Sequence, residues 1–219
     1  MPIPRHGLRS TRSDRQPRLV KLVVSAFAVV AGAALAVVPA TSATAASPKT
    51  HRYRARAAAD CADANASVAN TSLAALRSAV VCLINRQRAL HHLPALQASP
   101  LLTQSAQDWT DAMVSTDQFT HGANFAGRIS ATGYVWRSAG ENIATGLATP
   151  RTVVRAWMAS TGHCQNILNP TYRNVGTGIN PHPVKSWATG PGTWTQDFAL
   201  GMHQSAPSGN FSPMDGCPY

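Results

Sequence analysis

The sequence predicts an α+β domain in which several helices precede a late antiparallel sheet. Apolar residues recur with the 3.6-residue period of a helix between residues 73 and 160, whereas residues beyond 174 alternate with period two. Helices followed by strands are typical of layered α+β domains. The chain has 219 residues, 44% hydrophobic and 13% charged, which is enough for one packed domain with extensions and excludes a disordered protein.

The first 45 residues predict a cleaved secretory signal. A basic stretch ends at Lys21, residues 22–38 carry no charge, and residues 43–45 read Ala-Thr-Ala, a small-x-small cleavage pattern. The alternative is a membrane anchor, but the uncharged run is shorter than the roughly 20 residues that a span needs. We therefore expect an extracellular protein with no membrane span after cleavage.

The rest of the chain divides by pattern into three parts. Residues 46–72 are basic and lack periodicity, which predicts a flexible leader. Residues 73–204 carry the helical and strand periods and form the expected domain. Residues 205–219 follow as a C-terminal tail that contains Cys217.

Four helices are expected, each with a start signal or a clear end. The first follows the cap candidates Thr71 and Ser72, and the second opens at Ser99-Pro100. A short helix is expected over residues 125–132, and a fourth runs from Thr149-Pro150 to near residue 160. The apolar face of the first helix comprises Leu73, Leu76, Val80, Leu83, Ile84 and Leu90.

Strands are expected over residues 174–179 and 194–200. In the second of these, Trp194, Gln196, Phe198 and Leu200 form one alternating set. The segment between the two strands is rich in proline and glycine, and residues 184–188 within it are a candidate short strand.

The net charge of +10 does not indicate a nucleic-acid partner. Residues 1–45 hold six cations and one acid, which is half of that charge, and the chain from residue 73 holds nine cations and six acids. We expect no nucleic-acid binding, and we expect a monomer.

The four cysteines predict two disulfides. An exported chain meets oxidising conditions, and no C-x-x-C spacing is present, which excludes a zinc ribbon. Three pairings are open. We expect Cys82 to pair with Cys164, because both lie in the domain, and Cys61 to pair with Cys217, because both lie in the tails.

Glu141 and two histidines are the candidate site residues. Glu141 is the only glutamate of the chain and stands among small and apolar residues, where a buried carboxylate needs a cation, a metal or hydrogen-bond donors. A loop carboxylate that accepts backbone N–H bonds is the simpler alternative. His121 follows the second predicted helix, and His163 follows the fourth. Each by itself is more often a packed or surface histidine than a ligand.

Six short motifs follow one another along the chain. They are Asn85-Arg-Gln-Arg88, Phe119-Thr-His121, Gly140-Glu-Asn-Ile143, Trp157 to Leu168, Gly176-Thr-Gly178 and Trp194-Thr-Gln-Asp-Phe198. In this order they resemble the CAP superfamily, the cysteine-rich secretory, antigen 5 and pathogenesis-related proteins, also called the SCP domain. The resemblance covers residues 76–202 and is to the compact bacterial form. It implies an α-β-α sandwich with a central antiparallel sheet and a cleft.

The resemblance places His121, Glu141 and His163 in this cleft. A fourth cleft position, acidic in many relatives, carries Ser160 here. Two imidazoles and one carboxylate suit Zn²⁺ better than Mg²⁺, so zinc is the candidate metal, although no cofactor is expected to be required. The alternative is a metal-free cluster in which Glu141 accepts hydrogen bonds from one or both histidines.

Three functions remain open at this point. The first is an extracellular binding module whose cleft holds a lipid, a peptide or a cell-wall fragment. The second is a hydrolase in which the cleft activates water, with or without zinc. Neither an H-E-x-x-H helix nor a G-x-S-x-G elbow supports it. The third is a structural extracellular protein.

Overall fold

A computed structural model describes residues 61–219, and these form an α+β domain as expected. The expected secretory signal lies outside the described residues, as does the first part of the expected leader. The helices are α1 (Leu73–Leu90), α2 (Pro100–Thr116), α3 (Phe125–Ala131), α4 (Pro150–Met158) and α5 (Thr161–Ile167), with a short 3₁₀ helix η1 (Pro213–Gly216). The strands are β1 (Gln97–Ala98), β2 (Trp136–Thr145), β3 (Asn174–Asn180) and β4 (Thr193–Gly201).

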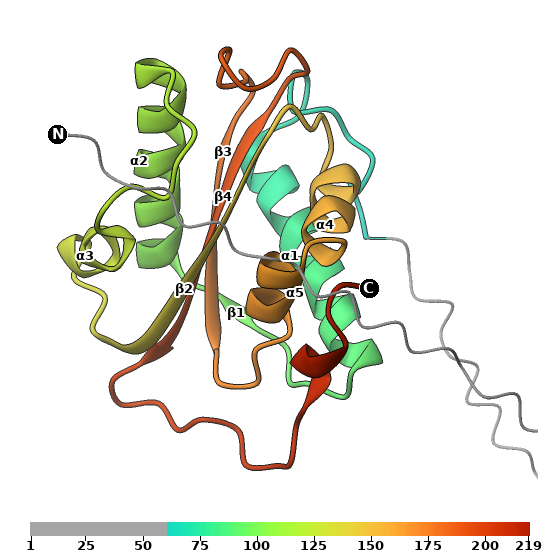
Figure 1. The fold of residues 1–219 in the computed structure, drawn as a ribbon, viewed down its shortest axis with the longest axis vertical. Helices are drawn as coiled ribbons and strands as arrows, with labels where there is room; N and C mark the ends of the chain where they lie inside the picture. Colours follow the sequence, from blue (N-terminus) through green and yellow to red (C-terminus); the bar gives the residue numbers. More distant parts are fainter. Residues whose placement is uncertain (1–60) are drawn as a thin grey trace, which may run out of the picture. The chain divides into compact units, whose positions relative to one another are not determined.

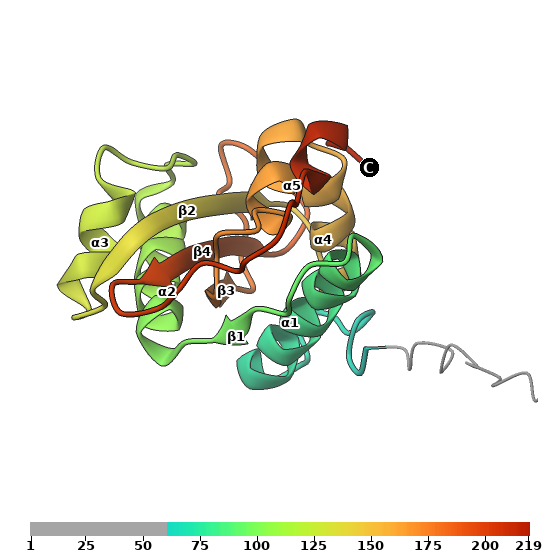
Figure 2. The ribbon, with the colours of Figure 1, turned by 90° about the horizontal axis from the view of Figure 1, so that it is seen from below.

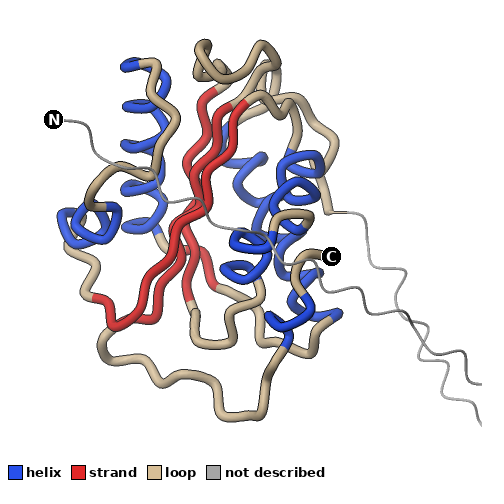
Figure 3. The backbone as a smooth tube through the Cα atoms, in the orientation of Figure 1, coloured by secondary structure: helices blue, strands red, loops and turns tan. Residues whose placement is uncertain are grey.

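The four strands form one sheet in the order β1-β3-β4-β2. The long pairs β3–β4 and β2–β4 are antiparallel, and the two-residue strand β1 runs parallel to β3. Helices α2 and α3 lie on one face of the sheet, and α1, α4 and α5 lie on the other (Figures 1 and 2). Figure 3 shows the strands as a middle layer between two layers of helices, which confirms the expected sandwich.

Each face of the sheet has its own core. On the α1, α4 and α5 side, Trp157, Trp194 and Phe198 are among the large buried side chains. On the α2 and α3 side, two smaller clusters are centred on Leu102 with Ile129 and on Met113 with Ile143. Because helices cover both faces, β3 and β4 are buried almost throughout.

The Gly176-Thr-Gly178 motif of β3 lets α2 lie directly against the sheet. A Cβ atom at Gly176 would come within 2.1 Å of the Leu102 carbonyl carbon, and one at Gly178 within 2.1 Å of the Ala106 carbonyl oxygen. No side chain fits such a space, so both positions need glycine. This close approach places the α2 side chains over the middle of the sheet.

The start signals of three predicted helices are confirmed. Ser72 accepts a hydrogen bond from the Ala75 amide, Ser99 from Leu102, and Thr149 from Thr152. The expected helix over 125–132 is also present as α3.

Four elements of the structure, β1, β2, α5 and η1, were not predicted, and two smaller expectations are wrong. No secondary structure was assigned to β2, whose small residues show no alternation, or to the seven-residue helix α5. Residues 184–188 form turns rather than a strand. Leu90 is 72% exposed, because it is the last residue of α1 and lies beyond the sheet-facing surface.

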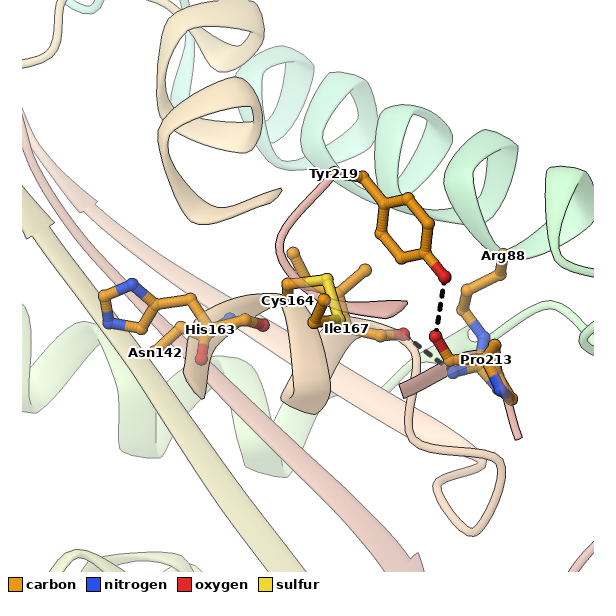
Figure 4. Close-up of a disulfide and its surroundings, with 8 residues drawn as sticks. Arg88, Asn142, His163, Cys164, Ile167, Pro213 and Tyr219 are labelled. Atoms are coloured by element: carbon orange, nitrogen blue, oxygen red, sulfur yellow. Dashed lines mark hydrogen bonds between the residues drawn. A yellow bond between two sulfur atoms is a disulfide. The ribbon is translucent and has the colours of Figure 1, made fainter. Parts of the chain in front are cut away.

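The predicted disulfide pairing is wrong. Cys61 pairs with Cys82 of α1, and Cys164 of α5 pairs with Cys217. The prediction joined the two tails to each other, whereas in the structure each terminal segment packs separately against the domain. Figure 4 shows the second disulfide immediately after His163, whose ring points away from the sulfur atoms.

Both terminal segments extend the domain beyond residues 73–204. Cys61, Ala64 and Val68 are buried in the same core as α1, so the described end of the expected leader, residues 61–72, packs as part of the fold. At the other end, the Tyr219 amide donates to the Met158 carbonyl at 2.9 Å. The disulfides therefore fasten segments that already contact the core.

Arg88 connects α1 to the end of α5 through hydrogen bonds to backbone carbonyls. It is fully buried and donates to the carbonyls of Pro94, Ile167 and Asn169 at 2.8 to 2.9 Å (Figure 4 draws the bond to Ile167). Burial, followed by the charge of Arg173, lowers the pKa of Arg88 to about 10. It is the last residue of the Asn85-Arg-Gln-Arg88 motif, and its role is structural.

Replacing Arg88 with lysine is expected to lower the free energy of unfolding by about 2 to 4 kcal/mol. A single ammonium group cannot reach three carbonyls that a planar guanidinium satisfies together, so buried acceptors lose their donors. Urea unfolding measures the loss, with Arg137→Lys on the exposed part of β2 as the matched control. Equal stability of the two variants would contradict the structural role.

Candidate functional site

Glu141 lies on β2, the edge strand of the sheet, with its side chain on the α2 and α3 side. Its side chain is 1% exposed. Two side chains from the other layer hold the strand at this point, because Asn166 donates to the Glu141 carbonyl at 3.0 Å and Trp157 donates to the Ile143 carbonyl at 3.2 Å. These donors cover carbonyl groups that an edge strand would otherwise leave unpaired.

Both carboxylate oxygens of Glu141 have a partner. His121 Nδ1 lies 2.8 Å from Oε1, and Arg128 Nη2 donates to Oε2 at 2.5 Å. Arg128 also donates through Nη1 to the His121 carbonyl at 3.1 Å. Its guanidinium carbon lies 3.9 Å from the ring centre of Trp109. The three side chains therefore form one ion-pair cluster supported by an aromatic ring.

His121 presents its free ring edge to solvent. Its side chain is 50% exposed, whereas Glu141 is buried behind it. A carboxylate oxygen only accepts hydrogen bonds, so Nδ1 is the protonated nitrogen and Nε2 is directed away from Glu141. The loop that carries His121 is fixed by Trp109, whose Nε1 donates to the Thr120 carbonyl at 3.0 Å.

His163 approaches the cluster from the other layer. It lies in α5, which is tied to the edge strand because Asn142 Nδ2 donates to the His163 carbonyl at 3.2 Å. Burial lowers the pKa of His163, and the charge of His121 lowers it further. His163 thus lies at the same edge of the sheet as His121 and Glu141. Ser160, the N-terminal cap of α5, makes no side-chain capping bond.

Asp197 is a second acid of the site, and it was not predicted. It is the cross-strand partner of Glu141 in β4 and is 1% exposed. Burial and the Glu141 charge raise the pKa of Asp197 to about 8, and Ser105 and Arg128 oppose this only in part. Neither Asp197 oxygen makes a hydrogen bond of acceptable geometry within the described part of the chain.

The proton of this pair of acids resides on Asp197. Two carboxylates side by side in a buried place cannot both be charged without a large cost. Glu141 contacts a guanidinium and an imidazole directly, whereas Asp197 forms no ion pair among the described residues, and its interactions with Ser105 and Arg128 offset its burial only in part. Glu141 therefore holds the negative charge, and Asp197 is a neutral acid at neutral pH.

The residues present do not fit a zinc ion. Both Glu141 oxygens are already bound, and the Arg128 guanidinium supplies the positive charge that a metal would otherwise bring. Among residues 61–219, no three His, Cys, Asp or Glu side chains are placed to hold a metal ion. The geometry favours the metal-free alternative, in which Glu141 pairs with a histidine.

Asp197 and Arg128 were not predicted as site residues, and they differ in how clearly the sequence marks them. Asp197 stands between Gln196 and Phe198 in a strand that is buried on both faces, where any acid needs an explanation. In the period-two pattern, Asp197 lies on the face of the strand opposite to Trp194, Gln196 and Phe198. The sequence does not show that helices cover this opposite face as well. Arg128 is a single cation in a seven-residue helix, and nothing in the sequence distinguishes it from a surface arginine.

Comparison with known proteins identifies the family. The model of the CAP family, described as the cysteine-rich secretory protein family, matches residues 81–198, more than half of the chain. The chain belongs to the CAP family. The matched residues include His121, Glu141, His163 and Asp197, so the whole cluster lies within the CAP domain.

Among curated proteins, the CAP chain is 37% identical over 134 residues to the uncharacterised protein YkwD of Bacillus subtilis strain 168, covering 59% of this chain and 49% of YkwD. The chain thus spans about half of that relative. An outer surface protein of Borrelia burgdorferi matches 56% of this chain and 90% of its own, with 18% identity and a TM-score of 0.50. An extracellular SCP-domain protein of Bacillus anthracis matches 59% of this chain and 44% of its own, with 21% identity and a TM-score of 0.49.

Replacing His121 with alanine is expected to raise the pKa of His163. The charge of His121 is one of the two causes that lower this pKa, and its removal also exposes the Glu141 carboxylate to His163. A pH titration of the His163 ring signals by NMR measures the change, with His182 in a distant turn as the internal reference. An unchanged or lower pKa would show that the two histidines do not share a site.

Proposed function

We propose that this CAP protein is secreted and is a non-catalytic binding module for a polar cell-wall fragment, which it contacts through His121 and His163. The observation that carries the proposal is the state of Glu141. With both of its oxygens occupied, Glu141 orients His121 rather than binding a ligand or activating water. The exposed ring edge of His121 and the half-buried His163 are left to contact the ligand.

The chemistry of the cluster favours a polar ligand over a lipid tail. The site offers imidazole nitrogens next to an ion pair, and these groups match hydroxyl, carbonyl and amide groups of glycans and peptides. Two disulfides within the described residues suit an extracellular location. No helix of the described chain is long and apolar enough to cross a membrane.

Hydrolysis is the second candidate, and one observation favours it. A neutral acid beside a charged one is the arrangement that general acid and base catalysis uses. However, Asp197 is 1% exposed and the Glu141 side chain beside it is buried as well, so neither carboxyl group is open to a bound substrate. The binding module is therefore the function that the geometry supports best.

Sedimentation with insoluble peptidoglycan tests the proposal. The secreted protein is expected to sediment with the polymer, and His121→Ala is expected to sediment less, whereas the matched control His182→Ala should behave like wild type. Failure of the wild-type protein to sediment would overturn the cell-wall ligand. Soluble fragments released with time by the wild type, but not by Glu141→Gln, would favour the hydrolase instead.

A further inference from the structure

Two aromatic side chains in the loops around the site present an apolar surface to solvent. Trp187, in the loop between β3 and β4, is 65% exposed, more than any other Trp, Tyr or Phe among residues 61–219. Its ring centre lies 5.4 Å from that of Phe119, and the two ring planes are tilted by 54°. Phe119 is half-buried and comes two residues before His121, so the pair joins the loop of Trp187 to the loop of His121.

The loop that carries Trp187 is fixed to two other elements. The Ser186 amide donates to Asp117 Oδ1 at 2.9 Å and its hydroxyl donates to the Asp117 carbonyl at 3.1 Å, at the end of α2. The Val184 amide donates to Thr145 Oγ1 of β2 at 3.0 Å, and the Trp187 amide donates to the Val184 carbonyl at 3.0 Å. Because the loop is already ordered, a ligand that contacts the Trp187 ring pays little conformational entropy.

The aromatic pair lies one step along β2 from the contact between His121 and Glu141. Ile143 is two residues from Glu141 on the same face of β2, and it belongs to the apolar cluster against which Phe119 packs. Two residues of extended chain span at most about 7 Å, both from Glu141 to Ile143 and from His121 to Phe119. A chain of a few sugar units is long enough to contact both Trp187 and His121.

The surroundings of the rings favour a ligand with a small apolar face and a polar rim. Lys185 and Ser186 precede Trp187, Gln118 and Thr120 flank Phe119, and all four are exposed. A protein or lipid surface is typically recognised by a contiguous apolar patch of several hundred Å², which one tryptophan among polar residues does not provide.

A sugar ring has the required shape and chemistry. Its C–H bonds form an apolar face whose slightly positive hydrogens are attracted to the negative face of an indole, and its hydroxyl groups surround that face. The Trp187 indole N–H makes no hydrogen bond within the described residues, so it is available to donate to a hydroxyl group at the rim.

We propose that Trp187, supported by Phe119, is a stacking surface for one sugar ring of a glycan chain whose neighbouring sugars reach His121. This inference rests on the proposed function, and it assigns the polar cell-wall fragment to the glycan strand rather than to the peptide. Trp187 supplies apolar contact, and the histidines supply hydrogen bonds.

NMR titration with chitotetraose tests the inference. The indole N–H signal of Trp187 is expected to shift, whereas those of the buried Trp157 and Trp194 should stay in place. Cellotetraose, which has the same flat C–H faces without acetamido groups, should shift the Trp187 signal as well. No shift with either glycan would overturn the proposal. A shift with tetra-alanine alone would assign the surface to a peptide, and loss of the Trp187 signal with phosphatidylglycerol vesicles alone would assign it to a lipid surface; each result also overturns the proposal.

Two substitutions of Trp187 separate stacking from a general loss of structure. Trp187→Ala should weaken the binding of chitotetraose about tenfold, and Trp187→Phe, which keeps an aromatic face, should retain most of the affinity. Val135→Ala is the matched control, because Val135 is 62% exposed at the opposite end of β2, and it should bind like wild type. Calorimetric titration measures the affinities. Equal affinity of Trp187→Ala and wild type would contradict the stacking role.

The outcome is separable from that of the proposed function. Peptidoglycan sedimentation that depends on His121 but is unchanged by Trp187→Ala would overturn the stacking surface and leave the binding module intact. Failure of the wild type to sediment, with the Trp187 shift by chitotetraose preserved, would do the reverse.

Discussion

Replacing Asp197 with asparagine is expected to stabilise the protein, by an amount that grows as the pH rises from about 4 to about 8. Asparagine has the shape of the neutral acid and cannot ionise. The wild-type protein must keep a proton on a buried carboxyl group over this range, whereas its unfolded chain releases the proton. Removing that cost favours the folded state of the variant.

The sign follows from the direction of the pKa shift. The pKa of Asp197 is raised from 3.8 to about 8, so the folded state binds more protons than the unfolded state between these values. Its contribution to stability is full below pH 4 and is lost as the pH rises to about 8. At about 1.4 kcal/mol per unit, the upper limit of the change is roughly 6 kcal/mol, and we expect about 1 to 4 kcal/mol at pH 8.

Urea unfolding gives the free energy of unfolding of both proteins at each pH from 4 to 9. The difference between the two curves of free energy against pH measures the effect, because the titration of all other groups is common to both proteins and cancels. The exposed Asp215→Asn is the matched control and should follow the wild type. A variant that is less stable than wild type at pH 8 would mean that a charged Asp197 is needed in the fold.

Replacing Arg128 with methionine is expected to cost about 3 to 5 kcal/mol of stability at neutral pH. The change removes the guanidinium from Glu141, whose side chain is 1% exposed, and leaves a buried carboxylate with His121 as its remaining partner. The contact with the Trp109 ring is lost as well, which adds about 1 kcal/mol or less.

A double-mutant cycle separates the ion pair from simple packing. In the Arg128→Met and Glu141→Gln double variant, the uncompensated charge is gone, so much of the lost stability should return. Arg137→Met on the same sheet edge is the matched control, because that arginine is exposed. If the Arg128 and Arg137 variants unfold at the same urea concentration, the buried ion pair does not stabilise the site.

The helices of this protein were largely predictable because their signals are local. Ser99 before Pro100, and Thr149 before Pro150, each combine a cap with a proline that fits only the first helical turn. The strand β2 was not predictable in this way. Its buried residues 140–144 are small or polar, apart from Ile143, and show no alternation of apolar residues, whereas the equally buried β4 keeps large apolar residues at alternate positions.

The candidate site was predictable only through the order of its motifs. Periodicity does not show that His121, Glu141 and His163 meet, because they come from a loop, a strand and a short helix, and only the resemblance grouped them. It could not supply Arg128 or Asp197, whose roles depend on which side chains face each other across α3, β2 and β4. The predicted disulfide pairing was wrong for a similar reason, because the pairing depends on where each terminal segment packs in the folded protein.

A ¹³C NMR titration of the side-chain carboxyl groups tests the central claim most directly. The claim is that a charged Glu141, paired with His121 and Arg128, lies against a neutral Asp197. The account predicts that the Asp197 carboxyl signal stays in its protonated position through pH 6 and changes near pH 8. An Asp197 signal that changes near pH 4, as in an exposed aspartate, would contradict it.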